Sequence, residues 1–382
     1  MKKICVITLL NVVNYGSVLQ TYATQKIFEK LGYKVEFINY RRENETVDQI
    51  RKKQLKSIPN KQWIKKIYNI VIAIPRRNKQ VNQTFGKFLR DNIHLTEKEY
   101  VGFNSLCEDV PKADIYCTGS DQMWNSKWNG GIEKSFFLDF VNQKPKIAFS
   151  TSIGMTEFNE AEANMIIPLL KKYDFITVRE KSAQELLKSY GISAEMILDP
   201  TLLLPGEFWE KFAKKSKYTK EKKEYILVYK LHENHNDLDF DEYVRNTSKE
   251  FKLPVRVLSY GVPHKKDFDE YIGLPDIYDF VALFENARYV ITDSFHGTSF
   301  CVNLKKQFSC IYPSHFSTRM DNILKICGLL DRHLKNQEEK SFLKQIDFEK
   351  SYQRLEQARK KSWEILDAQM QGIGDQRVNE DN

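Results

Sequence analysis

The chain has 382 residues, of which 41% are hydrophobic and 13% aromatic, so we expect two domains with sizeable cores and exclude global disorder. Its 59 basic and 51 acidic residues give a formal net charge of +8, which fits an anionic substrate or an anionic membrane surface. The sequence contains no arginine-rich tract and no zinc-finger spacing, so we expect no nucleic-acid partner.

The first half of the chain alternates between strands and helices. A basic, helical segment fills roughly 46–95, between the second and third strands. Lys2 and Lys3 precede an apolar run as in a signal peptide, but Asn11 and Asn14 interrupt it, so we expect a buried strand and a cytoplasmic protein. The expected strands lie at 3–10, 34–39, 114–118, 146–150, 175–178 and 196–198, and the expected helices at 17–31, 158–172 and 180–190.

The same alternation restarts after Pro200. Repeated βα units favour parallel sheets with helices on both faces. We therefore predict an α/β fold of two Rossmann-like domains facing a cleft, similar to the GT-B glycosyltransferases, with domains at 1–200 and 201–350. The tail at 351–382 is expected to begin as a helix that crosses back onto the first domain. Expected strands lie at 225–229, 254–258, 289–292 and 308–312, and helices at 276–286, 295–304, 318–327 and 350–370.

The strongest local signal is the segment Tyr289–Phe300, YVITDSFHGTSF. A strand ends there, and Ser294 can cap the helix that follows. Gly297 and Thr298 leave room for a ligand near backbone amides that bind phosphate or carboxylate. His296 would lie in the first helical turn, where it could donate to an anion or act as a general acid. The alternative is a capped turn whose histidine bonds to nearby backbone, and spacing alone leaves both possibilities open.

Three further segments accompany this motif in a fixed order. They are NYGSVLQ at 14–20, DIYCTGSDQMWN at 114–125, and the stretch from Val178-Arg179-Glu180 to Asp199-Pro200. The ordered set resembles the polysaccharide pyruvyl transferase family over residues 14–300. The resemblance implies transfer of pyruvate from phosphoenolpyruvate to a saccharide, as a cyclic ketal, in bacterial capsule or exopolysaccharide biosynthesis. It also implies a donor side in 201–350 and an acceptor side in 1–200, with phosphoenolpyruvate as co-substrate and neither a metal nor an organic cofactor.

The reaction itself requires an acid for the methylene carbon, a base for the sugar hydroxyls, and cations or amides for phosphate and carboxylate. His296 matches the histidine of the family motif and is our candidate for donor binding or proton delivery. Asp121 is our candidate for the base or for a hydroxyl anchor. Trp124 offers an apolar face for a sugar, although it could equally lie in the core.

The chain departs from the family pattern two residues before that histidine. Members often carry an arginine there, and this chain has Ser294. A bidentate guanidinium contact with phosphate or carboxylate is therefore missing at that point. Arg179, Arg288 or Arg319 could supply the charge, and Arg179 is preferred because it lies in a matching segment. The alternative for Arg179 is a surface arginine paired with Glu180 or another nearby carboxylate.

The first loop adds candidate ligands for sugar hydroxyls, although Gly16 is also explained by a tight turn between strand and helix. The complete expected binding set is Asn14, Tyr15, Gly16, Ser17, Gly119, Ser120, Trp124, Arg179, Ser294, Phe295, Gly297 and Thr298.

The segment 51–79 combines basic residues with an apolar helical face. Such a helix could contact the inner face of the membrane and meet a lipid-linked glycan acceptor, but it is more often an ordinary surface helix. Two rival functions share the predicted fold: a nucleotide-sugar glycosyltransferase and a non-catalytic saccharide-binding protein.

Overall fold

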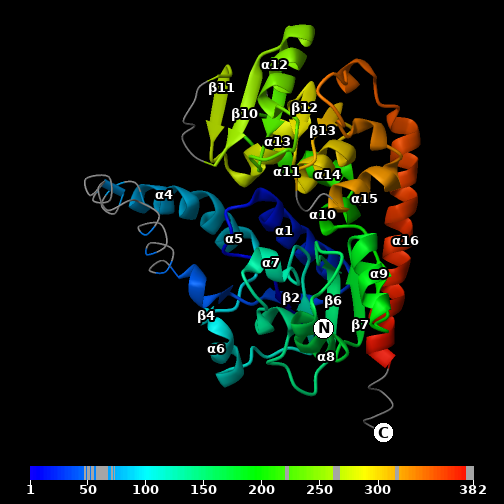
Figure 1. Cartoon of the computed structure of the whole chain (residues 1–382). Coiled ribbons are helices and arrows are strands. Elements are labelled where there is room, and N and C mark those ends of the chain that lie inside the picture. The colour runs from blue at the N-terminus through cyan, green and yellow to red at the C-terminus, as the bar shows by residue number, and fades with distance from the viewer. Residues whose placement is uncertain are drawn as a thin grey trace.

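Figure 1 shows the computed structural model of the chain, which has two lobes joined by a long C-terminal helix. The structure describes residues 1–46, 74–219, 223–260, 267–314 and 318–375, and isolated positions 49, 52, 56, 68, 69 and 72. Most of the basic segment 51–79 lies outside the described residues. Its described end belongs to α4 (Ile74–Val81), none of whose residues is buried.

The first lobe is built on a six-stranded parallel sheet of order β2-β1-β5-β6-β7-β8. Every residue of β5, β6 and β7 is buried, because helices cover both faces of a parallel sheet. The strands are β1 (Lys3–Ile7), β2 (Lys34–Phe37), β5 (Ile115–Thr118), β6 (Lys146–Thr151), β7 (Phe175–Val178) and β8 (Glu195–Met196). A small separate sheet pairs β3 (Tyr40–Arg41) with β4 (Tyr100–Val101).

The second lobe contains a five-stranded parallel sheet of order β11-β10-β9-β12-β13. Four of its strands match the expected ones. The fifth, β11 (Glu270–Gly273), was not predicted, because it lies at the sheet edge and buries a single residue. The other four are β9 (Ile226–Tyr229), β10 (Val255–Ser259), β12 (Tyr289–Thr292) and β13 (Phe308–Cys310).

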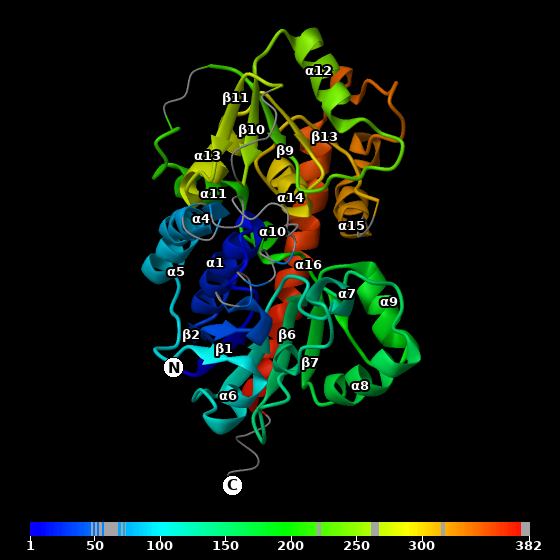
Figure 2. The same cartoon turned by 60° about the vertical axis from the view of Figure 1, so that its left-hand side comes forward.

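Helices pack around both sheets (Figure 2). In the first lobe these are α1 (Tyr15–Lys30), α5 (Lys87–Asn92), α6 (Gly102–Glu108), α7 (Ser126–Asn129), α8 (Glu160–Leu170), α9 (Lys181–Ser189) and α10 (Pro200–Leu203). In the second they are α11 (Gly206–Ala213), α12 (Phe240–Phe251), α13 (Ile277–Asn286), α14 (Phe295–Asn303) and α15 (Thr318–Cys327). Short irregular turns are the 3₁₀ segments η1 (Glu43–Glu45), η5 (Lys134–Phe137), η6 (Leu330–Arg332) and η7 (Ser341–Leu343), and the π-helical η4 (Asn82–Gly86).

The last helix, α16 (Phe348–Asp375), runs along both lobes as expected (Figures 1 and 2). Near the first sheet, the backbone N–H of Leu198 donates to Ser362 Oγ at 3.1 Å. At the junction between the lobes, Arg359 Nε donates to the carbonyl of Leu202 at 2.8 Å. The prediction of a C-terminal helix that crosses back is therefore confirmed, and the helix extends further than predicted.

Aromatic side chains pack the two lobes together on one side. The Tyr15 ring on α1 stacks on Phe280 of α13 with centroids 4.5 Å apart and an interplanar angle of 6°. Tyr22 of α1 likewise packs against Phe212 of α11, with ring centroids 5.3 Å apart. Such pairs add to the apolar burial of each ring, so they fix how the carboxyl ends of the two sheets face each other.

Candidate active site

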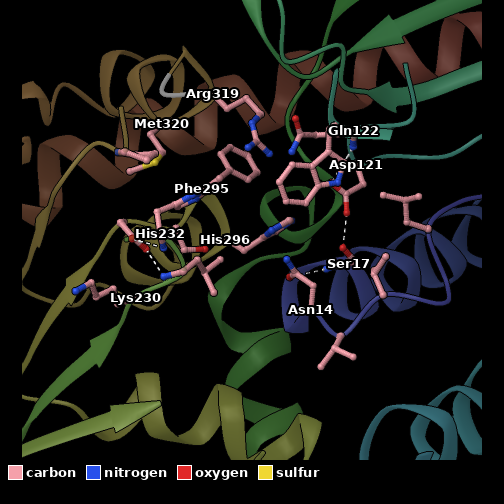
Figure 3. Close-up of a pocket in the computed structure, with 18 of the residues that line it drawn as sticks. Asn14, Ser17, Asp121, Gln122, Lys230, His232, Phe295, His296, Arg319 and Met320 are labelled. Atoms are coloured by element: carbon pink, nitrogen blue, oxygen red, sulfur yellow. Dashed lines mark hydrogen bonds between the residues drawn. The ribbon is translucent and has the colours of Figure 1, made fainter. Parts of the chain in front are cut away.

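A cavity of about 640 Å³ lies between the carboxyl ends of the two sheets, where a doubly wound fold places its ligands (Figure 3). Its first-lobe wall comes from the loop before α1 and the loop after β5. Its second-lobe wall comes from the loop after β9 and the starts of α14 and α15. The lining residues are Leu9, Val12, Val13, Asn14, Ser17, Asp121, Gln122, Trp128, Lys230, Leu231, His232, Glu233, Tyr260, Asp293, Ser294, Phe295, His296, Pro313, Arg319 and Met320.

The start of α14 is capped as the sequence predicts. Ser294 has extended backbone angles, and its Oγ accepts from the backbone N–H of Gly297 at 3.2 Å. Gly297 itself faces the sheet, because a Cβ there would lie 2.4 Å from Thr292 Oγ1. Thr298 is buried and donates to the carbonyl of Ser294. Gly297 and Thr298 therefore do not line the cavity: they let the helix pack closely on β12, which corrects their expected contact with ligand.

His296 points into the cavity from the first turn of α14 (Figure 3). Its ring packs against Gly16, where an added Cβ would lie 2.0 Å from Nδ1. Nε2 lies 3.8 Å from Asp199 Oδ2, beyond hydrogen-bond range, and has no hydrogen-bond partner among the described residues. Burial lowers the pKa of His296 to about 4, against the attraction of Asp199. The imidazole is thus neutral near pH 7 and available to a ligand.

A buried ion network lies behind His296. Arg179 Nη1 donates to Asp199 Oδ2 at 2.8 Å and to Ser120 Oγ at 3.3 Å, and Nη2 lies 3.4 Å from Asp121 Oδ1. The Arg179 side chain is fully buried and does not line the cavity. The expected pairing of Arg179 with nearby carboxylates is confirmed. Its expected positions are corrected: it is neither a surface residue nor placed to contact a ligand, because carboxylates of its own chain occupy its guanidinium.

Asp121 lines the cavity at the edge of this network. It receives the hydroxyl hydrogen of Ser17 and, at 2.8 Å, the backbone N–H of Gln122 (Figure 3). Burial raises the pKa of this carboxyl, but Arg179 and then His296 outweigh that effect and bring it below its usual value. Asp121 is therefore an ionised hydrogen-bond acceptor, suited to orient a hydroxyl and weak as a base.

Arg319 supplies the positive charge in the cavity wall. Its guanidinium lies over the Phe295 ring at 5.6 Å from the centroid, and that of Arg179 lies at 4.7 Å. Burial, and then repulsion from Arg179, lower the pKa of Arg319 to about 10. Within the described part of the chain, Arg319 forms no ion pair, and its Nε has no hydrogen-bond acceptor. Glu180, Asp121 and Asp199 attract this guanidinium electrostatically, but none of the described carboxylates forms an ion pair with it.

Comparison with known proteins assigns this arrangement to a family. A family model described as polysaccharide pyruvyl transferase matches residues 14–315. The chain belongs to the polysaccharide pyruvyl transferase family. This is a transferase family, and the match includes all four segments that carry the resemblance in the sequence.

Solved structures show the fold that this pyruvyl transferase family member adopts. It is similar to S. aureus MnaA solved with UDP, with a TM-score of 0.50 and 16% identity over 97% of this chain and 90% of that one. It is also similar to UDP-N-acetylglucosamine 2-epimerase from Rickettsia bellii, with a TM-score of 0.50 and 12% identity over 96% of each chain. These are GT-B proteins, so the predicted GT-B-like fold is confirmed. No curated protein matches the chain.

Several residues expected to bind substrate lie elsewhere in this family member. Trp124 is 1% exposed, donates from Nε1 to the carbonyl of Phe136, and stacks on Phe137. It belongs to the core of the first lobe, which corrects its expected role in stacking a sugar. Tyr15 is also buried, and its hydroxyl donates to the carbonyl of Pro275, so it joins the lobes. Gly119 faces β1, where its Cβ would lie 3.1 Å from the Cβ of Thr8.

Ser120 and Gly16 lie behind the residues that line the cavity. Ser120 Oγ donates to Asp199 Oδ2 at 3.2 Å and does not line the cavity. Asn14 caps α1 through the N–H groups of Gly16 and Ser17 while lining the cavity. Arg288 is excluded as the replacement arginine, since its side chain is 56% exposed beside Glu224 and outside the cavity lining.

Sequence reasoning missed several lining residues, among them Gln122, Trp128, His232, Glu233 and Tyr260. They lie outside the predicted strands and helices or at their ends, where hydrophobic periodicity carries no signal. In the described ranges, no group of three His, Cys, Asp or Glu side chains could hold a metal ion. No described helix combines the length and apolarity needed to cross a bilayer.

Proposed function

We propose that the protein transfers pyruvate from phosphoenolpyruvate to a saccharide, forming a cyclic ketal, in cell-surface polysaccharide biosynthesis. Family membership supports the class of reaction. The observation that carries the choice of donor is Arg319, a partly buried cation in the cavity wall that forms no ion pair within the described residues. A guanidinium that opens on a cavity and has no paired carboxylate is suited to bind an anionic ligand there.

Phosphoenolpyruvate carries a phosphate and a carboxylate, and Arg319 can bind either through two parallel hydrogen bonds. Ser294 stands where many family members have an arginine, and Arg319 provides a guanidinium on the same wall of the cavity. Under this proposal, Arg319 on α15 takes the place of the arginine that many family members carry at the start of α14. The Phe295 ring contacts the guanidinium groups of both Arg179 and Arg319.

His296 is proposed to deliver the first proton. A bound anion opposes the burial that keeps its pKa at about 4, so donor binding favours a protonated ring. Transfer of that proton to the methylene carbon makes the adjacent carbon electrophilic. One sugar hydroxyl attacks this carbon, phosphate leaves, and a second hydroxyl closes the ring. Of the two hydroxyl protons released, one restores His296 and one leaves with phosphate, so the reaction requires no oxidant, metal or organic cofactor. Asp121 orients the attacking hydroxyl.

The test compares Arg319→Met with Arg288→Met, an exposed arginine outside the cavity. Calorimetric titration with phosphoenolpyruvate should show that Arg319→Met weakens binding by about 10- to 150-fold, the value of a charged hydrogen-bonded contact. Arg288→Met should bind as the wild type does. Arg319→Met should also unfold at a temperature no lower than the wild type, since it removes a partly buried cation that Arg179 repels.

Unchanged affinity in Arg319→Met would refute this role for Arg319. If the wild type binds no phosphoenolpyruvate and releases no phosphate with any saccharide acceptor, the proposed function is wrong. A thermal-shift screen should include UDP-sugars beside phosphoenolpyruvate, because stabilisation by a UDP-sugar alone would point to the rival glycosyltransferase activity. Binding of saccharides without any turnover would point to the non-catalytic alternative.

A further inference from the structure

The imidazole of His296 crosses the boundary between the lobes and lies against Gly16. His296 belongs to α14 of the second lobe, and Gly16 to the first turn of α1 in the first lobe. Figure 3 shows the ring facing the start of α1, where Asn14 and Ser17 are labelled. A Cβ added at Gly16 would lie 2.0 Å from Nδ1, 2.3 Å from Cγ and 2.7 Å from Cε1. A residue with a side chain at position 16 must therefore displace the ring.

The backbone does not require glycine at position 16. Gly16 lies within a helix and is not among the residues with positive φ. Its N–H donates to Asn14 Oδ1 at 2.8 Å, a bond that any residue except proline could form. Alanine at a helical position is more favourable than glycine. The glycine is therefore explained by the ring that lies on it, and not by a tight turn of the chain.

The Nε2 side of the same ring faces a fixed carboxylate. Nε2 is buried and lies 3.8 Å from Asp199 Oδ2, with no hydrogen-bond partner among the described residues. Asp199 Oδ1 accepts from the N–H and the hydroxyl of Thr201 at 2.9 and 2.6 Å, and Oδ2 accepts from Arg179 at 2.8 Å. A carboxylate held there favours the neutral tautomer with its hydrogen on Nε2, which leaves the lone pair on Nδ1.

Nδ1 is the nitrogen that a ligand can reach. His296 lines the cavity, while Nε2 is enclosed beside Asp199. The three short distances from the added Cβ place it over one face of the ring, above Cγ, Nδ1 and Cε1. Gly16 therefore covers a face and leaves the in-plane lone pair of Nδ1 open.

We propose that Gly16 is a positioning residue for His296, and that Nδ1 is the nitrogen that exchanges a proton with the ligand. The absence of a side chain at position 16 lets the ring lie with Nε2 toward Asp199. The catalytic step rests on the proposed function. The Nδ1–H bond of the protonated ring breaks as the double-bond electrons of phosphoenolpyruvate form the new methylene C–H bond, and a proton from a sugar hydroxyl later restores Nδ1–H. The placement of the ring does not depend on that function.

The experiment measures the pKa and the tautomer of His296 in the full chain. NMR of histidine labelled with ¹³C and ¹⁵N reports both, and His296→Ala assigns the signal. Gly16→Ala is compared with Gly372→Ala, a helical glycine whose added Cβ meets no atom within 4 Å. Urea unfolding of Gly16→Ala, alone and combined with His296→Ala, shows whether the methyl group and the ring compete for one place. The charged groups that act on the ring, and that every variant keeps, are Asp199, Arg179, Asp121 and Arg319.

The neutral wild-type ring should carry its hydrogen on Nε2, and burial should hold its pKa well below 6.5. Gly16→Ala should raise this pKa by about one unit or more, because the displaced ring is less buried. Gly372→Ala should leave it unchanged. Gly16→Ala should lower the urea midpoint of the wild type and raise that of His296→Ala, since alanine favours the helix once the ring is gone. Saturating phosphoenolpyruvate should raise the pKa of the wild-type ring and place the added proton on Nδ1.

The role of Gly16 is overturned if Gly16→Ala leaves the pKa of His296 unchanged, or if it shifts the urea midpoint equally with and without the imidazole. A neutral ring with its hydrogen on Nδ1 would overturn the assignment of the reacting nitrogen. If phosphoenolpyruvate does not bind the wild type, while the pKa shift and the opposite midpoint shifts are found, the proposed function is wrong and the placement of the ring by Gly16 stands.

Discussion

Lowering the pH from about 7.5 to about 5 should destabilise the folded protein through His296. The ordinary pKa of 6.5 applies to the unfolded chain, and burial lowers it to about 4 in the folded one. Between these values the unfolded state binds a proton that the folded state does not. The contribution of neutral His296 to the free energy of unfolding is therefore fully present above pH 6.5 and is lost as the pH falls toward 4.

The size of the effect follows from the two pKa values. One pKa unit corresponds to about 1.4 kcal/mol, so the loss between about pH 7.5 and about pH 5 is about 2 kcal/mol. Urea unfolding of the wild type and of His296→Gln at both pH values measures it. Glutamine keeps polar character at this position and does not titrate, so the wild type should lose about 2 kcal/mol more than the variant.

If the wild type and His296→Gln lost the same free energy of unfolding, the reasoning would be refuted, because His296 would then have the same pKa in the folded and unfolded states. Saturating phosphoenolpyruvate gives a second control. If the donor binds beside His296, its negative charge raises the pKa of the ring, and the difference between the wild type and His296→Gln should shrink. A difference that does not change with donor would separate the buried histidine from the proposed donor site.

Two further substitutions test how the site is built. Gly297→Ala should lower the free energy of unfolding by about 1–3 kcal/mol, because its Cβ would lie 2.4 Å from a threonine hydroxyl oxygen. In the same urea assay Gly372→Ala, in α16 with no atom within 4 Å of its Cβ, should raise it by about 0.5–1 kcal/mol. If Gly297→Ala left the free energy of unfolding unchanged, that result would contradict the close packing of α14 on β12. Tyr15→Phe should cost about 1–2 kcal/mol by leaving the carbonyl of Pro275 unpaired, with unchanged calorimetric affinity for phosphoenolpyruvate. A large loss of affinity in Tyr15→Phe would restore the expected binding role of this tyrosine.

Much of the fold could be predicted from local pattern. The strands at 175–178 and 289–292 were predicted with the bounds that the structure has, because strands buried on both faces are continuous apolar runs. The helix 318–327 was likewise predicted with its observed bounds. By contrast, α12 (Phe240–Phe251) was missed, because polar residues fill most of its length and four residues are buried. The edge strand β11 gave too little apolar signal to be recognised.

The candidate site, too, could be predicted from the sequence only in part. The Ser294 cap and the position of His296 in the first turn of α14 depend on neighbours in the chain, so the sequence was sufficient to predict them. The family resemblance was likewise present in the sequence, as the match over residues 14–315 confirms.

Tertiary structure alone decided which of two similar residues faces the cavity. Trp124 and Trp128 are close in the sequence, yet Trp124 is buried against Phe137 whereas Trp128, in α7, is exposed. Arg179 and Arg319 are both basic, but the partners of Arg179 come from Asp121 and Asp199, which are 58 and 20 residues away in the chain. The sequence thus determined the strands, the helices and the cap, because those depend on chain neighbours. Which tryptophan stays exposed, and which arginine forms no ion pair among the described residues, depend on distant segments that meet only when the lobes fold and pack together.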